Sequence, residues 1–218
     1  MTKAAGSTQR TRLGRLSARG EYDPAAIARV LDAQQVCHVA YVVDGEPRII
    51  PTLYIRIDDY VYLHGNRQAA LLKHLAAGGF ASLSVMSLDG VVVARSGFHC
   101  SMNYRSAVVF GHGEPIPDDQ REAILDAFVE ALVPGHLAVV RAPTTQELNA
   151  TAVVRLPLTE ASSKIRTGPP ADAEGDLDAN VWAGVIPLST QVGVPEPSPD
   201  LRDQVSLPDY IKNYRPPA

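Results

Sequence analysis

Short stretches of alternating apolar and polar residues, separated by tight-turn signals, constrain this fold more than any other feature of the sequence. Residues 36–43 follow this period of two and end at Asp44-Gly45, a dipeptide typical of the type I′ turn between antiparallel strands. Residues 48–57 form the expected returning strand, and a further turn leads into a strand over 60–64. Strands joined by such short turns pair antiparallel, so a parallel Rossmann sheet is not expected.

The same pattern continues along the chain. We interpret 80–88 and 91–95 as a second hairpin around Asp89-Gly90. Strand character returns at 105–113, 151–158 and 181–188. Roughly seven or eight strands linked in this way predict a mostly antiparallel β-barrel. Pro51 interrupts one of these strands and marks an edge, a bulge or a place where another group meets the backbone.

Helix signals are inserted between the strands. Asp23 as N-cap and Pro24 at the first helical position predict a helix through Gln35. Other helices are expected at 68–77, from Asp118 or Asp119 to Leu132, and after Thr144, whose spacing to Glu147 fits a capping box. Strands and inserted helices together place the chain in the α+β class.

Charge and composition limit the partners of this fold. The formal net charge is −4, which argues against nucleic acid and anionic membranes, because both require a broad basic surface. No apolar run approaches the roughly 20 residues of a membrane-spanning helix. With two cysteines and no secretory signal, the expected compartment is the reducing cytoplasm.

Composition divides the chain into three regions. Residues 1–20 form a basic N-terminal arm with five basic residues and no acidic one, residues 21–190 form the barrel domain, and residues 191–218 form a Pro-rich C-terminal tail, expected to be extended or poorly ordered. We interpret the arm as a solvated segment that lies across a partner subunit. A phosphate-seeking or nucleic-acid-binding tail and an organellar transit peptide are the alternatives.

Several catalytic arrangements have no counterpart in the sequence. The six histidines are scattered without a zinc-binding spacing, so no metal site is expected. Cys100 follows His99 directly, but neighbouring residues of a strand point to opposite faces, so a cysteine nucleophile is not expected. Neither a Gly-x-Ser-x-Gly elbow nor a Walker loop occurs, and no catalytic residue is assigned.

One polar segment with ligand-binding potential is His64-Gly65-Asn66-Arg67, where a strand ends before an expected helix. Backbone N–H groups at such a helix start, together with the Arg67 guanidinium, match the geometry of a phosphate. An ordinary connection with a surface arginine is the alternative.

Two further segments carry polar side chains. We interpret 96–106 as a polar loop between strands, a setting in which binding residues concentrate, although a plain surface hairpin would look the same. Its candidate ligand-binding residues are Ser101, Asn103, Tyr104, Arg105 and Ser106. Lys164 and Arg166 alternate on an extended segment and so point the same way, either toward an anion or toward solvent.

Six motifs occur in order between about residues 15 and 190. They are Arg19-Gly20-x-Tyr22-Asp23, Ile50-Pro51-Thr52-Leu53-Tyr54, Leu63-His64-Gly65-Asn66-Arg67, Met102-Asn103-Tyr104-Arg105-Ser106-x-Val108-Val109-Phe110-Gly111, Ser163-Lys164-Ile165-Arg166-Thr167-Gly168-Pro169-Pro170 and Trp182-Ala183-Gly184-Val185-Ile186-Pro187. Together they resemble the pyridoxamine 5′-phosphate oxidase-related flavin-binding proteins, specifically the branch that includes nitroimidazole-resistance-type proteins.

The resemblance implies a split β-barrel homodimer that holds one FMN at each end of the subunit interface. The strand that carries Ile50, Pro51, Thr52 and Leu53 would run beside the isoalloxazine ring. The turn of Gly65, Asn66 and Arg67 would bind the FMN phosphate, and Arg105 and Ser106 would reach the flavin of the partner chain. Asn66 and Gln68 replace a serine and a cation that are frequent in the oxidases, so Lys164 or Arg166 would supply the missing charge.

The resemblance predicts an FMN-dependent oxidoreductase of the flavin reductase or oxidase type that acts on a small molecule. Arg105 or Lys164 would stabilise the reduced flavin. A non-catalytic flavin store or sensor is one alternative, and the same barrel with a deazaflavin or haem is another, with His64 or His99 as the iron ligand. Vitamin B6 oxidation is not expected, because the Pro-rich tail replaces the basic, aromatic region that grips that substrate.

Overall fold

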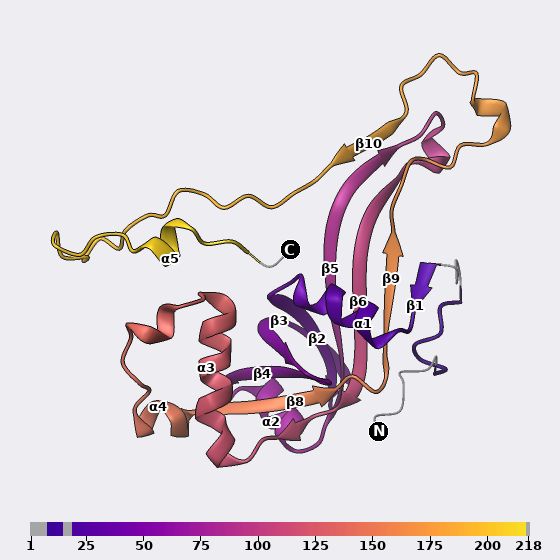
Figure 1. The fold of residues 1–218 in the computed structure, drawn as a ribbon. Coiled ribbons are helices and arrows are strands. Elements are labelled where there is room, and N and C mark those ends of the chain that lie inside the picture. The colour runs from indigo at the N-terminus through magenta and orange to yellow at the C-terminus, as the bar shows by residue number, and fades with distance from the viewer. Residues whose placement is uncertain (1–7, 15–18, 217–218) are drawn as a thin grey trace.

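The structure, a computed structural model, describes residues 8–14 and 19–216. The described strands form one sheet in the order β1-β9-β6-β5-β2-β3-β4-β8-β7, with β10 beside β5, and every pairing is antiparallel. The sheet curls into a half-barrel (Figure 1), which confirms the predicted α+β, mostly antiparallel split barrel. The strands are β1 (Gly20–Glu21), β2 (Val36–Val43), β3 (Glu46–Ile57), β4 (Tyr60–Asn66), β5 (Phe80–Val93), β6 (Ser101–His112), β7 (Glu114–Pro115), β8 (Thr151–Pro157), β9 (Ala161–Arg166) and β10 (Gly184–Pro187).

The first four helices occur where the local signals predict them. The helices are α1 (Pro24–Asp32), α2 (Ala70–Ala76), α3 (Arg121–Leu132), α4 (Thr145–Ala150) and, in the tail, the unpredicted α5 (Asp209–Lys212). Asp23 caps α1, since its carboxylate accepts a hydrogen bond from the Ala26 N–H at 3.1 Å. Thr144 and Glu147 form the predicted capping box of α4. Within the described ranges, none of the helices has the length and apolar character that a bilayer crossing requires.

The hairpin between β2 and β3 forms as predicted. Asp44 and Gly45 have φ of 53° and 80°, the left-handed conformation that a type I′ turn requires. Pro51 lies on β3 before the pairing with β4 begins at Tyr54, so in the described pairings this stretch has β2 on one side only. Of the interpretations that Pro51 left open, the structure therefore shows the sheet edge.

The predicted hairpin around Asp89-Gly90 is wrong. β5 is one continuous strand with a register shift against β6 just before Gly90. A Cβ at Gly90 would lie 2.8 Å from Val185 Cγ1 and 3.0 Å from the Ile186 carbonyl oxygen. The glycine therefore allows β10 to approach β5 closely, which is a different reason for glycine than a turn.

The segment 96–106 is a connection as far as Cys100, but it is strand from Ser101 on, which corrects the interpretation of the whole segment as a loop. Residues 94–100, which include a 3-10 turn at Gly97–His99, separate β5 from β6. The two strands form a long arm that extends beyond the barrel (Figure 1). The predicted residues of this segment are thus spread along β6, where successive side chains alternate between the two faces of the sheet. They are Ser101, Asn103, Tyr104, Arg105 and Ser106.

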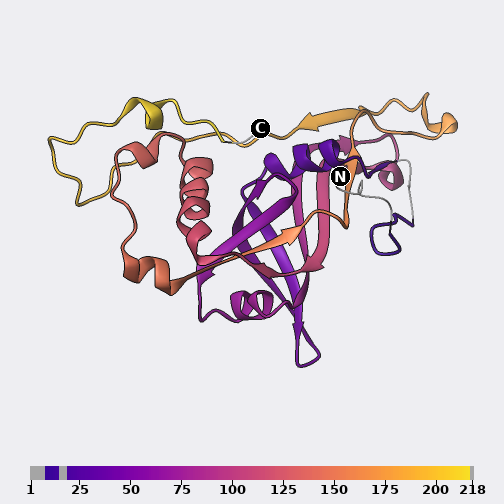
Figure 2. The same ribbon diagram turned by 60° about the horizontal axis from the view of Figure 1, so that its bottom comes forward.

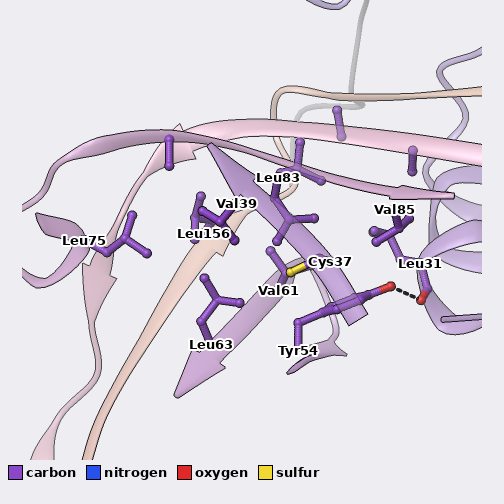
Figure 3. Close-up of a cluster of buried hydrophobic side chains, with 14 of the residues drawn as sticks. Leu31, Cys37, Val39, Tyr54, Val61, Leu63, Leu75, Leu83, Val85 and Leu156 are labelled. Atoms are coloured by element: carbon purple, nitrogen blue, oxygen red, sulfur yellow. Dashed lines mark hydrogen bonds between the residues drawn. The ribbon is translucent and has the colours of Figure 1, made fainter. Parts of the chain in front are cut away.

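A core of apolar side chains fills the half-barrel (Figure 3). Its fully buried members include Leu31, Val39, Leu63, Leu83 and Leu156. Tyr54 reaches into this core and donates its hydroxyl hydrogen to the Leu31 carbonyl, so the buried phenol is satisfied. Cys37 lies in the same core, where burial raises the pKa of its thiol to about 12. A thiol in such surroundings is inert, which fits the absence of a predicted cysteine nucleophile.

The described residues nearest the two ends of the chain contact the barrel and the helices. Arg10 of the predicted N-terminal arm forms an ion pair with Glu160 at 3.0 Å. Residues 1–7 and 15–18 of that N-terminal arm lie outside the described residues. Past β10 the tail is extended, as predicted, and returns toward α3 (Figures 1 and 2). There the Tyr210 hydroxyl lies 2.9 Å from His136 Nδ1.

Candidate functional site

A shallow hollow of about 410 Å³ lies on the outer face of β2, β5 and β6. Pro51 pairs in register with His38, which lines the hollow. Ser106 lines it from β6 and donates its hydroxyl hydrogen to the Lys164 carbonyl at 3.2 Å. Because residues paired in register share a face, the fold brings Pro51, Ser106 and Lys164 to one side of the sheet.

The residues on either side of Pro51 form a free edge of the sheet beside this face. Ile50 is 40% exposed, while Thr52 and Leu53 are half-buried. Since the described pairings leave one side of this stretch without a strand, its backbone polar groups on that side are available to a ligand. A planar ring with a polar edge fits such a strand edge.

Two of the predicted cations already have partners within the chain. Arg105 pairs with Asp89 at 3.0 Å. Arg166 is buried and donates to the Asn103 side-chain oxygen, while the Asn103 amide donates to the Gly168 carbonyl at 3.1 Å. These contacts stabilise the pairing of β5, β6 and β9. Because both guanidinium groups already bind side chains of this protein, either one would have to bind an anion in addition to its present partner.

The predicted site residues do not gather into one cluster of a single chain. Ser101, Tyr104 and the 3-10 turn that carries His99 belong to the arm, whereas His64 to Arg67 lie at the end of β4. Figures 1 and 2 both show the arm and the α3 side of the barrel at opposite ends of the molecule. Any site that uses both groups requires two chains.

The predicted phosphate turn closes the end of β4. Asn66 Oδ1 accepts a hydrogen bond from Gln68 N at 2.7 Å. The Arg67 N–H donates to the Ala150 carbonyl at 2.9 Å, which ties the turn to α4. α2 begins only at Ala70 and has seven residues. The Arg67 guanidinium, rather than this short helix, is therefore the feature that suits an anion.

His64 lies at this same end of β4 against an apolar wall. Its ring meets the ring of Phe128 from α3 edge-on, with centroids 4.2 Å apart. Burial lowers the pKa of His64, which favours the neutral imidazole. Its Nδ1 is buried and has no hydrogen-bond partner among the described residues. A neutral imidazole can bind a metal, and because Nδ1 is buried, only Nε2 of His64 could do so.

Arg121 is a candidate that the sequence did not reveal. Its side chain is 9% exposed, contacts Asp118 and donates to the Leu148 carbonyl at 3.3 Å. Burial and the nearby Arg67 lower the pKa of Arg121. One sequence feature could have drawn attention to it: Arg121 is a cation at the first position of a helix, where the helix dipole disfavours positive charge.

A known protein family matches the central part of the chain. The sequence profile described as pyridoxamine 5′-phosphate oxidase matches residues 23–165. The chain belongs to this family. The pyridoxamine 5′-phosphate oxidase family is that of the split-barrel flavin-binding proteins, so the predicted resemblance is confirmed.

Two solved structures are similar over nearly the whole chain. The flavocytochrome Anf3 from Azotobacter vinelandii is 38% identical with a TM-score of 0.90, and the match covers 95% of this chain and 97% of that one. The FAD and heme binding protein from Mycobacterium smegmatis is 39% identical with a TM-score of 0.86, covering 89% and 96%.

A more distant structure shares the fold alone. It is a candidate 5-nitroimidazole antibiotic resistance protein from Bacteroides thetaiotaomicron, 17% identical with a TM-score of 0.56, covering 67% of this chain and 86% of that one. Comparison with curated protein sequences found no match.

Proposed function

We propose that this protein binds FAD and haem and transfers electrons between them. The proposal is supported by the similarity of most of the chain to a flavocytochrome and to an FAD and heme binding protein, each 38% or more identical. The resemblance predicted FMN, with a deazaflavin or haem as an alternative ligand of the same barrel. The two relatives favour the combination of a flavin with haem, and the Mycobacterium smegmatis protein favours FAD as the flavin.

The observation that carries the haem proposal is the environment of His64. The Nδ1 of His64 is buried without a hydrogen-bond partner, so iron would bind through the other ring nitrogen, Nε2, which is not among the buried unpartnered atoms and makes no hydrogen bond in the described part of the chain. The ring is held by Phe128 and is kept neutral by burial, as iron ligation requires. His99, the other predicted iron ligand, packs against Phe98, which is 90% exposed at the end of the arm, so its surroundings are far wetter.

The flavin half of the proposal uses the outer face of the sheet. The free edge at Ile50 to Leu53 would orient the ring. Lys164 has no ion-pair partner in the described part of the chain, but β6, β5 and β2 separate its strand from β3, so it would supply positive charge to a flavin held by a second chain. A flavin takes up two electrons as hydride and releases them singly, while haem iron takes one at a time. We also propose a homodimer, because the arm and the end of β4 can complete one site only from two chains.

The absorption spectrum of the purified protein tests this proposal. We expect a flavin band and a Soret band together. His64→Ala should abolish the Soret band and keep the flavin band, whereas the control His99→Ala should keep both. A protein that has only the flavin band would contradict the haem proposal, and loss of the Soret band in His99→Ala alone would assign the iron to the arm.

The remaining parts of the proposal have separate tests. Reduction of an electron acceptor with NAD(P)H as donor distinguishes a redox enzyme from a flavin store or sensor, which would show no turnover. Sedimentation should give a dimer of the 23.4 kDa chain. A monomer that still binds flavin would contradict the two-chain site.

A further inference from the structure

A strap, residues 189–207, crosses the molecule between two fixed points. At one end β10 pairs with β5, and the Leu188 N–H donates to the Asp89 carbonyl at 3.1 Å. At the other end the Tyr210 hydroxyl lies 2.9 Å from His136 Nδ1. Figure 1 shows the chain running from the arm of β5 and β6 toward α3 between these points. The strap is therefore not a loose terminus, because both of its ends are held.

Between its fixed ends the strap is not covered by its own chain. Its hydrogen bonds, such as the one from the Leu201 N–H to the Ser198 carbonyl at 3.0 Å, are internal. No hydrogen bond or ion pair joins it to another part of residues 8–14 and 19–216. Every residue of the strap is exposed. Its own barrel therefore does not explain the course that the strap takes.

The side chains of the strap are not those of a segment that remains in water. Five of its large apolar residues are between 42% and 89% exposed; they are Val192, Val194, Leu201, Val205 and Leu207. Single exposed apolar residues are ordinary on a protein surface, whereas a group of them on one uncovered segment marks an interaction surface.

Prolines keep the middle of the strap extended. Pro195, Pro197 and Pro199 alternate along it, and each fixes its own φ and restricts the residue before it to an extended conformation. A segment of this kind loses less backbone entropy when it docks, because much of its freedom is already removed. The backbone of the strap thus suits binding to a partner.

The strap continues an apolar path that begins at the hollow on the outer face of the sheet. Ser106 lines that hollow, and Tyr104 and Met102 follow on the same face of β6 because side chains alternate along a strand. Met102 pairs in register with Val91 of β5, which pairs with Ile186 of β10. Exposed apolar side chains mark this path at Met86 (59%), Leu88 (45%) and Ile186 (49%). The outer face, where the proposed two-chain flavin site lies, therefore leads without interruption into the strap.

We propose that the strap of each chain binds the barrel of a second copy of this protein, so that each strap crosses the other chain. The inference rests on the homodimer of the proposed function and names a segment that stabilises it. A second copy is the partner because the apolar path enters the strap from the face that the two chains would share, and a symmetric dimer gives both straps the same surroundings. The strap lies outside residues 23–165, the part of the chain that the family profile matches.

Photo-crosslinking in mixed dimers tests the proposal. The photoreactive residue p-benzoylphenylalanine replaces Val194, which is 89% exposed, in dimers formed from unlabelled and heavy-isotope-labelled chains. Irradiation should join the strap to barrel peptides, and mass spectrometry should find pairs that combine a light with a heavy peptide. Pairs that always carry the same label would mean that the strap folds onto its own barrel, and would overturn the proposal. The same probe at Val139, which is 65% exposed and lies outside the strap, should give no mixed pairs.

Two added carboxylates provide a second measurement. Val194→Glu combined with Leu201→Glu should weaken the dimer about tenfold or more in sedimentation, because an interface that covers these positions would have to bury unpaired charge. The matched control is Val139→Glu combined with Val140→Glu, two exposed valines outside the strap, which should sediment as the parent does. The strap variant should keep the urea midpoint of the monomeric chain, since its own barrel does not contact the strap. An unchanged dimer affinity in the strap variant, or equal weakening in both variants, would overturn the proposal.

These outcomes separate the inference from the proposed function. The flavin and Soret bands report the cofactors whatever the strap does. A dimer that is as stable in the strap variant as in the parent would keep the proposed homodimer and reject the strap as its contact. A parent chain that sediments as a monomer and gives no mixed pairs would reject both.

Discussion

The ring of Phe128 meets the imidazole of His64 edge-on, with centroids 4.2 Å apart and the ring planes at 62°. This contact joins α3 to the end of β4. Phe128 is 3% exposed and belongs to a second apolar cluster with Ile55, Tyr62 and Val153. One aromatic side chain therefore packs the helix on the sheet and also sets the environment of the candidate iron ligand.

Replacing Phe128 with alanine should affect both roles. A buried Phe→Ala change costs about 3–5 kcal/mol of the free energy of unfolding, because it removes apolar contacts and leaves a cavity. The matched control is Phe98→Ala, because Phe98 is 90% exposed. That change should stay within about 0.5 kcal/mol. Urea denaturation of both variants measures the difference, and equal effects would contradict the role assigned to α3.

The protonation of His64 should make stability depend on pH. Burial lowers the pKa of His64 in the folded state below its ordinary value of 6.5. The unfolded chain then binds more protons, so the contribution of His64 is complete above pH 6.5 and is lost as the pH falls from 6.5 toward the folded-state pKa. Urea unfolding of the apoprotein between about pH 5 and 8 should show this decline.

The variant His64→Leu supplies the comparison for that experiment. It should lose part of the decline below pH 6.5, while above that pH the two proteins should differ by a constant amount. Parallel curves over the whole range would mean that His64 titrates normally in the folded protein.

Gly90 should be intolerant of larger side chains although it is not in a turn. A Cβ there would lie 2.8 Å from Val185 Cγ1, so Gly90→Val should push β10 away from β5. We expect faster amide hydrogen exchange at residues 184–186 and little change in the barrel core. Gly97→Ala is the control, because nothing lies within 4 Å of its added Cβ. Unchanged exchange in Gly90→Val would show that β10 adapts.

Elements with complete local signals could be predicted from the sequence. The turn at Asp44-Gly45, the Asp23 cap and the Thr144 capping box each act over a few residues, and all three form. Asp89-Gly90 has the same composition as the first turn but lies inside a strand. The difference is the pairing of β10, which comes from the far end of the chain and leaves no local signal.

The candidate site was predictable to the extent that it lies on one segment. His64 and Arg67 share the end of β4, and their residue types on a strand-to-helix connection sufficed to single them out. Phe128 and Arg121 belong to the same surface only because α3 packs on the sheet. Their contribution depends on tertiary packing, which periodicity and spacing do not encode.

Asn103 and Arg166 were both predicted to bind a ligand, whereas the structure shows them bound to each other. Asn103→Ala removes the acceptor of the buried Arg166 guanidinium and the donor to the Gly168 carbonyl. A buried donor left without a partner costs about 1–3 kcal/mol, so the urea midpoint should fall accordingly. Asn103→Asp retains an acceptor and adds a charge opposite to that of Arg166, so it should lose less stability. If both variants lose the same amount, the hydrogen bond to Arg166 is not what stabilises this part of the arm. A normal urea midpoint combined with weaker flavin binding in Asn103→Ala would instead support the ligand-binding role that the sequence predicted.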